Sequence, residues 1–127
     1  MADQQEINKK NIIEFYETVL NKKDWAAAPK FVGKYYKQHN QHAKDGVEGL
    51  QEYVKFAKEK FPNSHSTIKK AFACGDYVIL HVHAVMEPGQ PGAAVIDIFR
   101  MGNGKAVEHW DVHEEIIKDP ANKNTMF

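Results

Sequence analysis

The residues best suited to chemistry alternate along one segment near the C-terminus. His109, Asp111 and His113 occupy every second position, and alternate side chains of a β-strand share a face. A carboxylate between imidazoles in an apolar setting suits general acid/base catalysis, because burial raises its pKa towards neutrality. We therefore expect Asp111 to be a catalytic acid/base and His109 to be the catalytic group that tunes it.

The pairing of this segment with the preceding one decides which other side chains join it. Asn103-Gly104 is a strong signal for a two-residue hairpin turn. With that turn, Arg100 shares the face of Asp111, and Asp97 lies on the opposite face. Only a β-bulge or a longer turn would bring both carboxylates into one pocket. The sequence thus favours a set made of Asp111, His109 and Arg100.

Other polar side chains of the expected strands are candidates for substrate binding. Asn40 and Arg100 can bind a substrate oxygen, and His83 can tune the acid/base. The full set of substrate-binding candidates is His39, Asn40, His83, Asp97, Arg100 and Trp110. Structural roles compete with these assignments, since Asp97 and Arg100 can form a surface ion pair and Trp110 can be a core or dimer contact.

Seven histidines raise the alternative of a metal site. His81 and His83 in one strand, with His109 and His113 in another, could gather several imidazoles. The spacing matches no strong zinc pattern, and the sequence offers no cysteine partner or helical His-Glu motif. We expect neither a metal nor another cofactor, and a metal-dependent hydrolase is kept as an alternative hypothesis.

The pattern of apolar residues predicts helices in the first half of the chain and strands in the second. Capping boxes at Asp3 with Glu6 and at Asp45 with Glu48 begin a long N-terminal helix and a helix that ends before Pro62. A short helix is expected near residues 25–31. Strands are expected over residues 35–42, 67–74, 77–86, 94–101 and 106–117. This order favours one α+β domain over residues 1–127, with a curved antiparallel sheet around the N-terminal helix and a pocket on its concave side.

The composition argues against several classes of protein. Lys plus Arg and Asp plus Glu number 17 each, so the net charge is zero, and a nucleic-acid partner, which needs a clustered basic surface, is not expected. No apolar run approaches the ~20 residues that cross a membrane. The polar N-terminus has no apolar signal region, so we expect a cytoplasmic protein. The single cysteine, Cys74, is expected to be a small buried filler.

Several motifs of the chain resemble those of a known family. They are AVIDIFR at 94–100, GK at 104–105, EHWDV at 108–112, QHN at 38–40, DGVEG at 45–49 and the segment 121–127. Together they resemble the SnoaL-like family of the nuclear transport factor two-like superfamily. The family usually has a proline where this chain has Gln41.

The resemblance implies a cone-shaped α+β barrel and a reaction without metal or cofactor. The named members are polyketide cyclases that close a ring by intramolecular aldol condensation, with an acidic pocket residue as acid/base. Relatives on the same fold include ketosteroid isomerase and limonene epoxide hydrolase. In the epoxide hydrolase, the acid of the last strand and an early asparagine correspond to Asp111 and Asn40. The convex face of the sheet commonly forms a homodimer in this family.

We therefore expect a cofactor-free acid/base enzyme, an aldol-type cyclase or isomerase that acts on a small hydrophobic carbonyl compound. The alternative is a non-catalytic module on the same fold that binds a small ligand or dimerises. The expected partners are a small hydrophobic ligand or substrate and a second copy of the chain in a homodimer, without nucleic acid or membrane.

Overall fold

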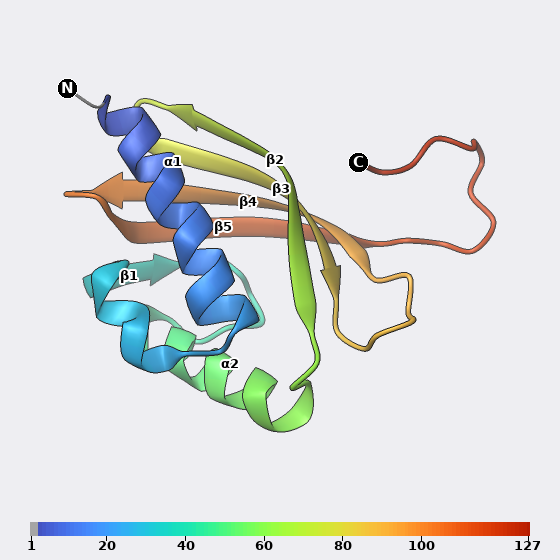
Figure 1. The fold of residues 1–127 in the computed structure, drawn as a ribbon, viewed down its shortest axis with the longest axis horizontal. Helices are drawn as coiled ribbons and strands as arrows, with labels where there is room; N and C mark the ends of the chain where they lie inside the picture. Colours follow the sequence, from blue (N-terminus) through green and yellow to red (C-terminus); the bar gives the residue numbers. More distant parts are fainter. Residues whose placement is uncertain (1–2) are drawn as a thin grey trace.

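A curved sheet faced by an N-terminal helix dominates the structure, a computed structural model that describes residues 3–127 (Figure 1). The elements in chain order are α1 (Gln4–Phe15), η1 (Tyr16–Asn21), η2 (Trp25–Lys30), β1 (Val32–Gln38), α2 (Gly46–Lys60), β2 (His65–Cys74), β3 (Tyr77–Val85), β4 (Ala93–Gly102) and β5 (Lys105–Glu115). The strands form one sheet in the order β1-β5-β4-β3-β2. The predicted α+β class and the sheet around the first helix are confirmed.

The direction of one strand differs from the prediction of an antiparallel sheet. Strands β2 to β5 form an antiparallel meander, but β1 pairs with β5 in parallel. Helix α2 and the whole meander separate β1 from β5 in the chain, so no hairpin sets their relative direction. The predicted hairpin turn is present, because Asn103 and Gly104 have φ angles of 50° and 77°, as a type I′ turn requires.

Two aspartates that mark helix starts in the sequence have different roles. Asp3 caps α1, because its side chain accepts a hydrogen bond from the backbone N–H of Gln5. Asp45 makes no such bond to α2. Its Oδ1 instead accepts the backbone N–H of Gln38 at 2.8 Å. The second predicted capping box is therefore wrong, and Asp45 fixes the end of β1, where the candidate site begins.

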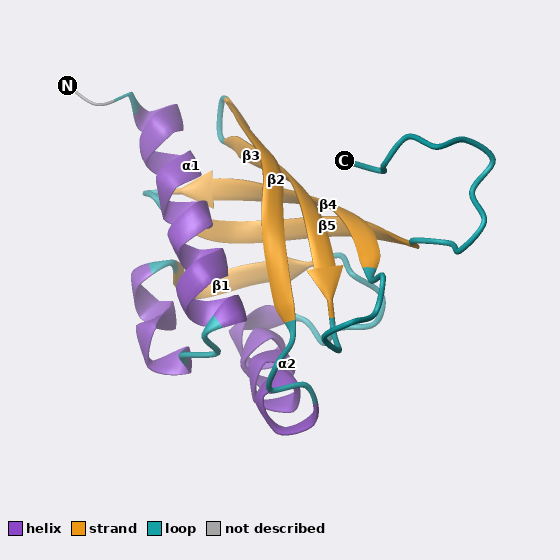
Figure 2. Cartoon of the chain, turned by 45° about the vertical axis from the view of Figure 1, so that its right-hand side comes forward, coloured by secondary structure: helices purple, strands orange, loops and turns teal. Residues whose placement is uncertain are grey.

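Helix α1 and the η1 segment that continues it lie across the concave side of the sheet (Figure 2). Ile12, Phe15 and Val19 are almost fully buried, and the Phe15 ring meets Phe99 of β4 edge-on at 6.0 Å. The facing side chains of β3 are equally buried, namely Val78, Leu80 and Val82. Each such side chain contributes about 1.5–3 kcal/mol by leaving water. This core holds β3 and β4 in place beneath the helix.

The segment after β5 is irregular and returns to the convex side of the sheet. The ring of Phe127 lies 5.2 Å from that of His81 and 4.8 Å from that of His83. Lys69 Nζ stands 5.6 Å from the same ring. The C-terminus is thus held against β2 and β3, away from the concave side.

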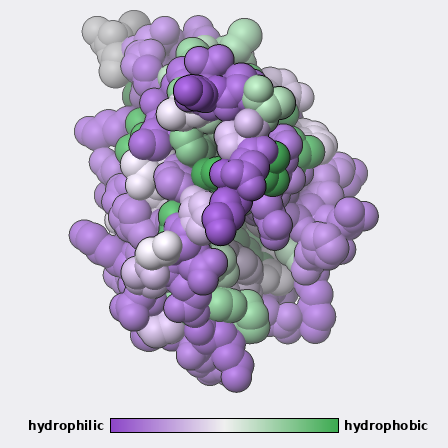
Figure 3. Space-filling model, turned by 90° about the vertical axis from the view of Figure 1, so that its right-hand side faces the viewer, coloured by the Kyte–Doolittle hydropathy of each residue, from purple (hydrophilic) through white to green (hydrophobic). Residues whose placement is uncertain are grey.

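The surface beside the β3–β4 loop and the C-terminal segment is mostly hydrophilic, with small separate hydrophobic patches (Figure 3). None of the helices within residues 3–127 has the length and apolar character needed to cross a bilayer. Cys74 is exposed, so its predicted burial is wrong. It ends β2, the strand at one edge of the sheet.

Candidate active site

A β-bulge in β5 decides which side chains face the concave side of the sheet. Met101 pairs with Ala106, but Arg100 pairs with Glu108, so Val107 is an extra residue in the ladder. Beyond the bulge, Asp97 lies directly opposite Asp111. The predicted register, in which these carboxylates lie on opposite faces and Arg100 accompanies Asp111, is therefore wrong. The physical reason is the single residue inserted between the turn and the functional strand positions.

The bulge brings a histidine and two aspartates together on the concave face. His109 Nε2 lies 2.7 Å from Asp97 Oδ1 and 3.8 Å from Asp111 Oδ2. Asp97 and His109 are both buried, and the hydroxyl of Tyr16 donates a hydrogen bond to the other oxygen of Asp97. The two residues that we expected to act as the acid/base pair, Asp111 and His109, thus lie in one cluster with Asp97.

The position of one proton on His109 follows from its neighbours. The side-chain oxygen of Gln38 accepts the backbone N–H of Asn40 at 3.0 Å, which fixes the orientation of the amide. The same oxygen lies 2.8 Å from His109 Nδ1, so Nδ1 must carry a proton and donate it. The contact between Nε2 and Asp97 then holds one further proton, on either the ring or the carboxyl group. His109 and Asp97 therefore form a pair that can give a proton to the cavity.

Asp111 has a different set of partners at the open side of the cluster. Its Oδ1 accepts a hydrogen bond from Asn40 Nδ2 at 2.7 Å, and its Oδ2 lies 3.0 Å from His113 Nε2. Burial raises the pKa of Asp111, but the His113 hydrogen bond, the charges of His109 and His113 and the Asn40 hydrogen bond together lower it below the usual value. The predicted rise in pKa is wrong for this carboxyl. Asp111 is therefore ionised at neutral pH.

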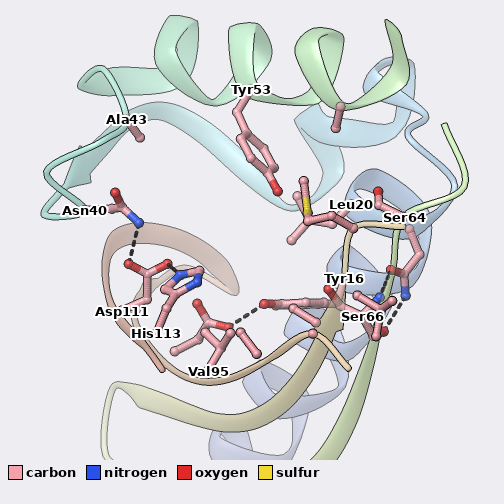
Figure 4. A pocket seen from close by; sticks show the side chains of 18 of the residues that line it. Tyr16, Leu20, Asn40, Ala43, Tyr53, Ser64, Ser66, Val95, Asp111 and His113 are labelled. Carbon is pink, nitrogen blue, oxygen red and sulfur yellow. Dashed lines mark hydrogen bonds and ion pairs between the residues drawn. The ribbon is translucent and has the colours of Figure 1, made fainter. Parts of the chain in front are cut away.

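These groups form the polar end of a cavity of about 580 Å³ between the sheet, α1 and α2 (Figure 4). Its volume is in the usual range for sites that bind small organic molecules. Phe15, Leu20, Leu50, Val95 and Phe99 supply part of its apolar wall. Its described lining includes four carboxylates, from Glu87, Asp97, Asp111 and Glu115, and neither lysine nor arginine. The cavity therefore favours uncharged, largely apolar ligands over anions.

Comparison with known proteins agrees with this architecture. A family model for SnoaL-like polyketide cyclases matches residues 10–116. The chain belongs to the SnoaL-like polyketide cyclase family. No curated protein sequence matches it significantly.

Solved structures share the fold of this SnoaL-like chain at low sequence identity. A candidate polyketide cyclase from Bacillus cereus has 21% identity and a TM-score of 0.71, over 85% of this chain and 74% of that one. TsrD from Streptomyces laurentii has 17% identity and a TM-score of 0.73, over 90% and 92% of the two chains. A candidate ketosteroid isomerase from Kribbella flavida has 13% identity and a TM-score of 0.71, over 94% and 86%. These identities establish the shared fold alone.

Four of the predicted substrate-binding residues of the SnoaL-like chain lie outside its cavity. Arg100 is on the convex face, where its Nε donates to Glu108 at 2.8 Å. His39 also contacts Glu108, at 2.6 Å, and its ring stacks on Trp110 at 4.7 Å. His83 Nε2 lies 2.7 Å from the Pro91 carbonyl oxygen. The bulge explains the position of Arg100, since it inverts the facing expected from a regular hairpin, and strand alternation places Trp110 on the convex face.

Two cavity residues of the SnoaL-like site were not predicted. Tyr16 and Tyr53 occupy helix positions where the sequence indicates only apolar packing. The structure places Tyr16 beside Asp97 and Tyr53 on the wall that faces Asp111 (Figure 4). For Tyr53, the spacing from Leu50 and Ala57 indicates the inward face of α2. Gln38 belongs to the QHN motif at 38–40, but its contact with His109 was not predicted.

The same cluster is the place where a metal ion could be held. Ligand atoms of Asp97, His109 and Asp111 all lie within 4.8 Å of one another. Each is already engaged, because Nε2 of His109 contacts Asp97 and both oxygens of Asp111 have hydrogen-bond partners. An ion would have to replace the 2.7 Å contact of His109 with Asp97. The hydrogen bonds thus satisfy the polar atoms of the cluster without an ion.

Proposed function

We propose that the chain is a cofactor-free acid/base enzyme, an aldol-type cyclase or isomerase, that acts on a small hydrophobic carbonyl compound. The observation that carries this proposal is the convergence of Asp97, His109 and Asp111 on one wall of a largely apolar cavity. An ionised carboxylate and a separate proton-holding pair within 4 Å supply a base and an acid at one place. Membership of the SnoaL-like polyketide cyclase family supports the same class of reaction.

Asp111 is the proposed base, because its lowered pKa keeps it ionised and it lines the cavity. It removes a proton from the carbon next to the substrate carbonyl. The C–H electron pair forms a carbon–carbon double bond, and the carbonyl electrons move to oxygen to give an enolate. Asn40, through its bond to Asp111 at 2.7 Å, and His113 hold the carboxylate in the orientation that this step needs.

The Asp97–His109 pair is the proposed proton donor for the second half of the reaction. In an isomerisation, a proton returns to a different carbon of the enolate. In an aldol closure, the enolate carbon attacks a second carbonyl, and the new alkoxide takes the proton from the pair. Tyr16 donates to Asp97 and so stabilises the carboxylate that remains. No oxidant, reductant or further reactant is needed for either outcome.

Exchange of carbon-bound hydrogen for deuterium tests the base without knowledge of the natural substrate. The probe is 2-acetylnaphthalene, whose methyl protons lie next to a carbonyl, followed by NMR in D₂O. We expect the protein to accelerate exchange and Asp111→Asn to slow it by about 100-fold or more, while Asp119→Asn in the exposed C-terminal segment leaves it unchanged. Full exchange activity in Asp111→Asn would exclude Asp111 as the base. Binding of the ketone without exchange in the wild type would favour the non-catalytic binding module.

We also propose that two copies of the chain associate through the convex face of the sheet. Phe72, Ile79, Ile98 and Trp110 lie directly opposite one another across four strands on this face. The neighbouring pair of Ile96 and Val112 is exposed, with 69% of Val112 accessible. A continuous apolar band of this kind is typical of a protein–protein contact, and a twofold arrangement lets it cover itself.

A further inference from the structure

A tyrosine hydroxyl on the wall opposite the acids takes no part in the hydrogen-bond network described above. Tyr53 extends from α2 into the space facing Asp97 and Asp111, with its hydroxyl directed inward (Figure 4). Tyr53 is 45% exposed, and no hydrogen bond from the described residues 3–127 is among the causes that shift the pKa of its hydroxyl. Burial, Asp97 and Asp111, in that order, raise the pKa of Tyr53, so the group keeps its proton. It is therefore an available donor on the wall opposite the acids.

Three polar groups nearer the acids already have partners among them or beside them. Tyr16 donates to Asp97, Asn40 donates to Asp111, and the His109 ring is engaged at both nitrogens. The cavity lining within the described chain contains no lysine or arginine that could bind a substrate oxygen by charge. Arg100, the predicted ligand of that oxygen, lies on the other face with Glu108. Tyr36 on β1 also lines the cavity near the acids, and its hydroxyl is hydrogen-bonded to Gln38. Tyr53 is thus the neutral donor that α2 presents to a substrate oxygen from the wall opposite the acids.

We propose that the Tyr53 hydroxyl donates the hydrogen bond that binds the carbonyl oxygen of an uncharged substrate, across the cavity from the acids that exchange its protons. This inference rests on the proposed acid/base function and names the substrate class of that site. A substrate held in this way has its reacting carbon turned towards Asp111 and its oxygen turned towards α2. The hydrogen bond strengthens as charge develops on the oxygen, which lowers the barrier to enolate formation. Four lining carboxylates disfavour a substrate that carries its own negative charge.

Two nearly isosteric probes separate the parts of this proposal. The ketone 2-acetylnaphthalene offers a neutral carbonyl oxygen, and 2-naphthoate places a carboxylate at the same position. Isothermal titration calorimetry should show that the ketone binds the wild type and that Tyr53→Phe weakens it by about two- to tenfold, the value of one neutral hydrogen bond. Tyr35→Phe is the matched control, because Tyr35 lies on β1 with 60% of its surface exposed and does not line the cavity. The naphthoate should bind the wild type more weakly than the ketone.

Vibrational spectroscopy of the bound ketone distinguishes a direct hydrogen bond from a packing effect. The carbonyl stretch should lie at lower wavenumber in the wild type and in Tyr35→Phe than in Tyr53→Phe. Equal ketone affinity and an unchanged carbonyl stretch in Tyr53→Phe would overturn the proposal, as would naphthoate binding as tight as ketone binding or a wild type that binds no ketone. These readouts need no turnover. If Tyr53→Phe changes neither ketone affinity nor the carbonyl stretch, while Asp111→Asn still slows deuterium exchange, only the role of Tyr53 is refuted and the proposed base stands.

Discussion

Removal of the Asp97 carboxylate is the perturbation that most directly probes the buried network. Asp97 is 2% exposed and accepts hydrogen bonds from the Tyr16 hydroxyl and from the His109 ring. The substitution Asp97→Ala leaves both of these buried groups without their partner. The protein should fold, since the apolar core under α1 is untouched, but it should be less stable.

The size of the effect follows from the number of groups left unpaired. Each buried polar group that loses its partner costs about 1–3 kcal/mol, so two such groups cost about 2–6 kcal/mol. Removing the carboxylate also removes the cost of burying it, which offsets part of the loss. We expect a net decrease of about 2–4 kcal/mol in the free energy of unfolding. This is a large share of the roughly 5–15 kcal/mol that stabilises a typical domain.

Urea unfolding at neutral pH measures this change through the midpoint at constant slope. Tyr16→Phe provides the decisive comparison in two backgrounds. In the wild type it removes a hydrogen bond to a carboxylate and should be destabilising by about 1.5–3 kcal/mol. In Asp97→Ala it removes an unpaired buried hydroxyl, and it should be neutral or stabilising. Asp119→Ala, in the exposed C-terminal segment, is the control for loss of an aspartate. An equal cost of Tyr16→Phe in both backgrounds would refute the network.

The remaining predictions concern the mouth of the cavity and the convex face. The hydrogen bond to Asp111 raises the pKa of His113 above 6.5, so protonated His113 stabilises the folded protein. This stabilisation is complete below pH 6.5 and is lost as the pH rises through the raised pKa. Asp111 has a lowered pKa, so its contribution is complete above 3.8 and is lost as the pH falls through the lowered value. NMR titration of His113 should give a lower pKa in Asp111→Asn, and an unchanged value would contradict the pair. Val112→Lys on the convex face should convert a dimer into a monomer in light scattering, whereas Ile117→Lys in the exposed segment should not, and a wild-type monomer would contradict the association.

Much of the architecture could be predicted because local signals agree with the tertiary structure. The stripe through Ile12, Phe15 and Val19 indicates a helix with one buried face, and these residues form the core. The Asn103-Gly104 pair defines its turn because both residues adopt positive φ angles. Signals of this kind depend on neighbouring residues alone, so they can be interpreted without knowledge of the rest of the fold.

The site was harder to predict because it depends on long-range register. A bulge at Val107 leaves no clear mark in the sequence, yet it determines the partners of Asp97 and Arg100. The tyrosines present a second difficulty. Tyr16 and Tyr53 fit an apolar stripe by spacing, and only the cavity shows that their hydroxyl groups face carboxylates. A side chain that is apolar along its length and polar at its tip satisfies a packing pattern and a chemical role at once.

The bulge also affects how this pair of acids can be found in other sequences. Because Val107 is an added residue, removing it would give a regular hairpin in which the same two aspartates still lie opposite each other. Two chains can therefore present one arrangement of acids with intervals that differ by one residue. A search that requires a fixed interval between the two aspartates would find the pair in one of these chains and miss it in the other. An alignment that allows a one-residue gap immediately after the turn would find the pair in both chains. It would also align the corresponding acids of the two chains with each other.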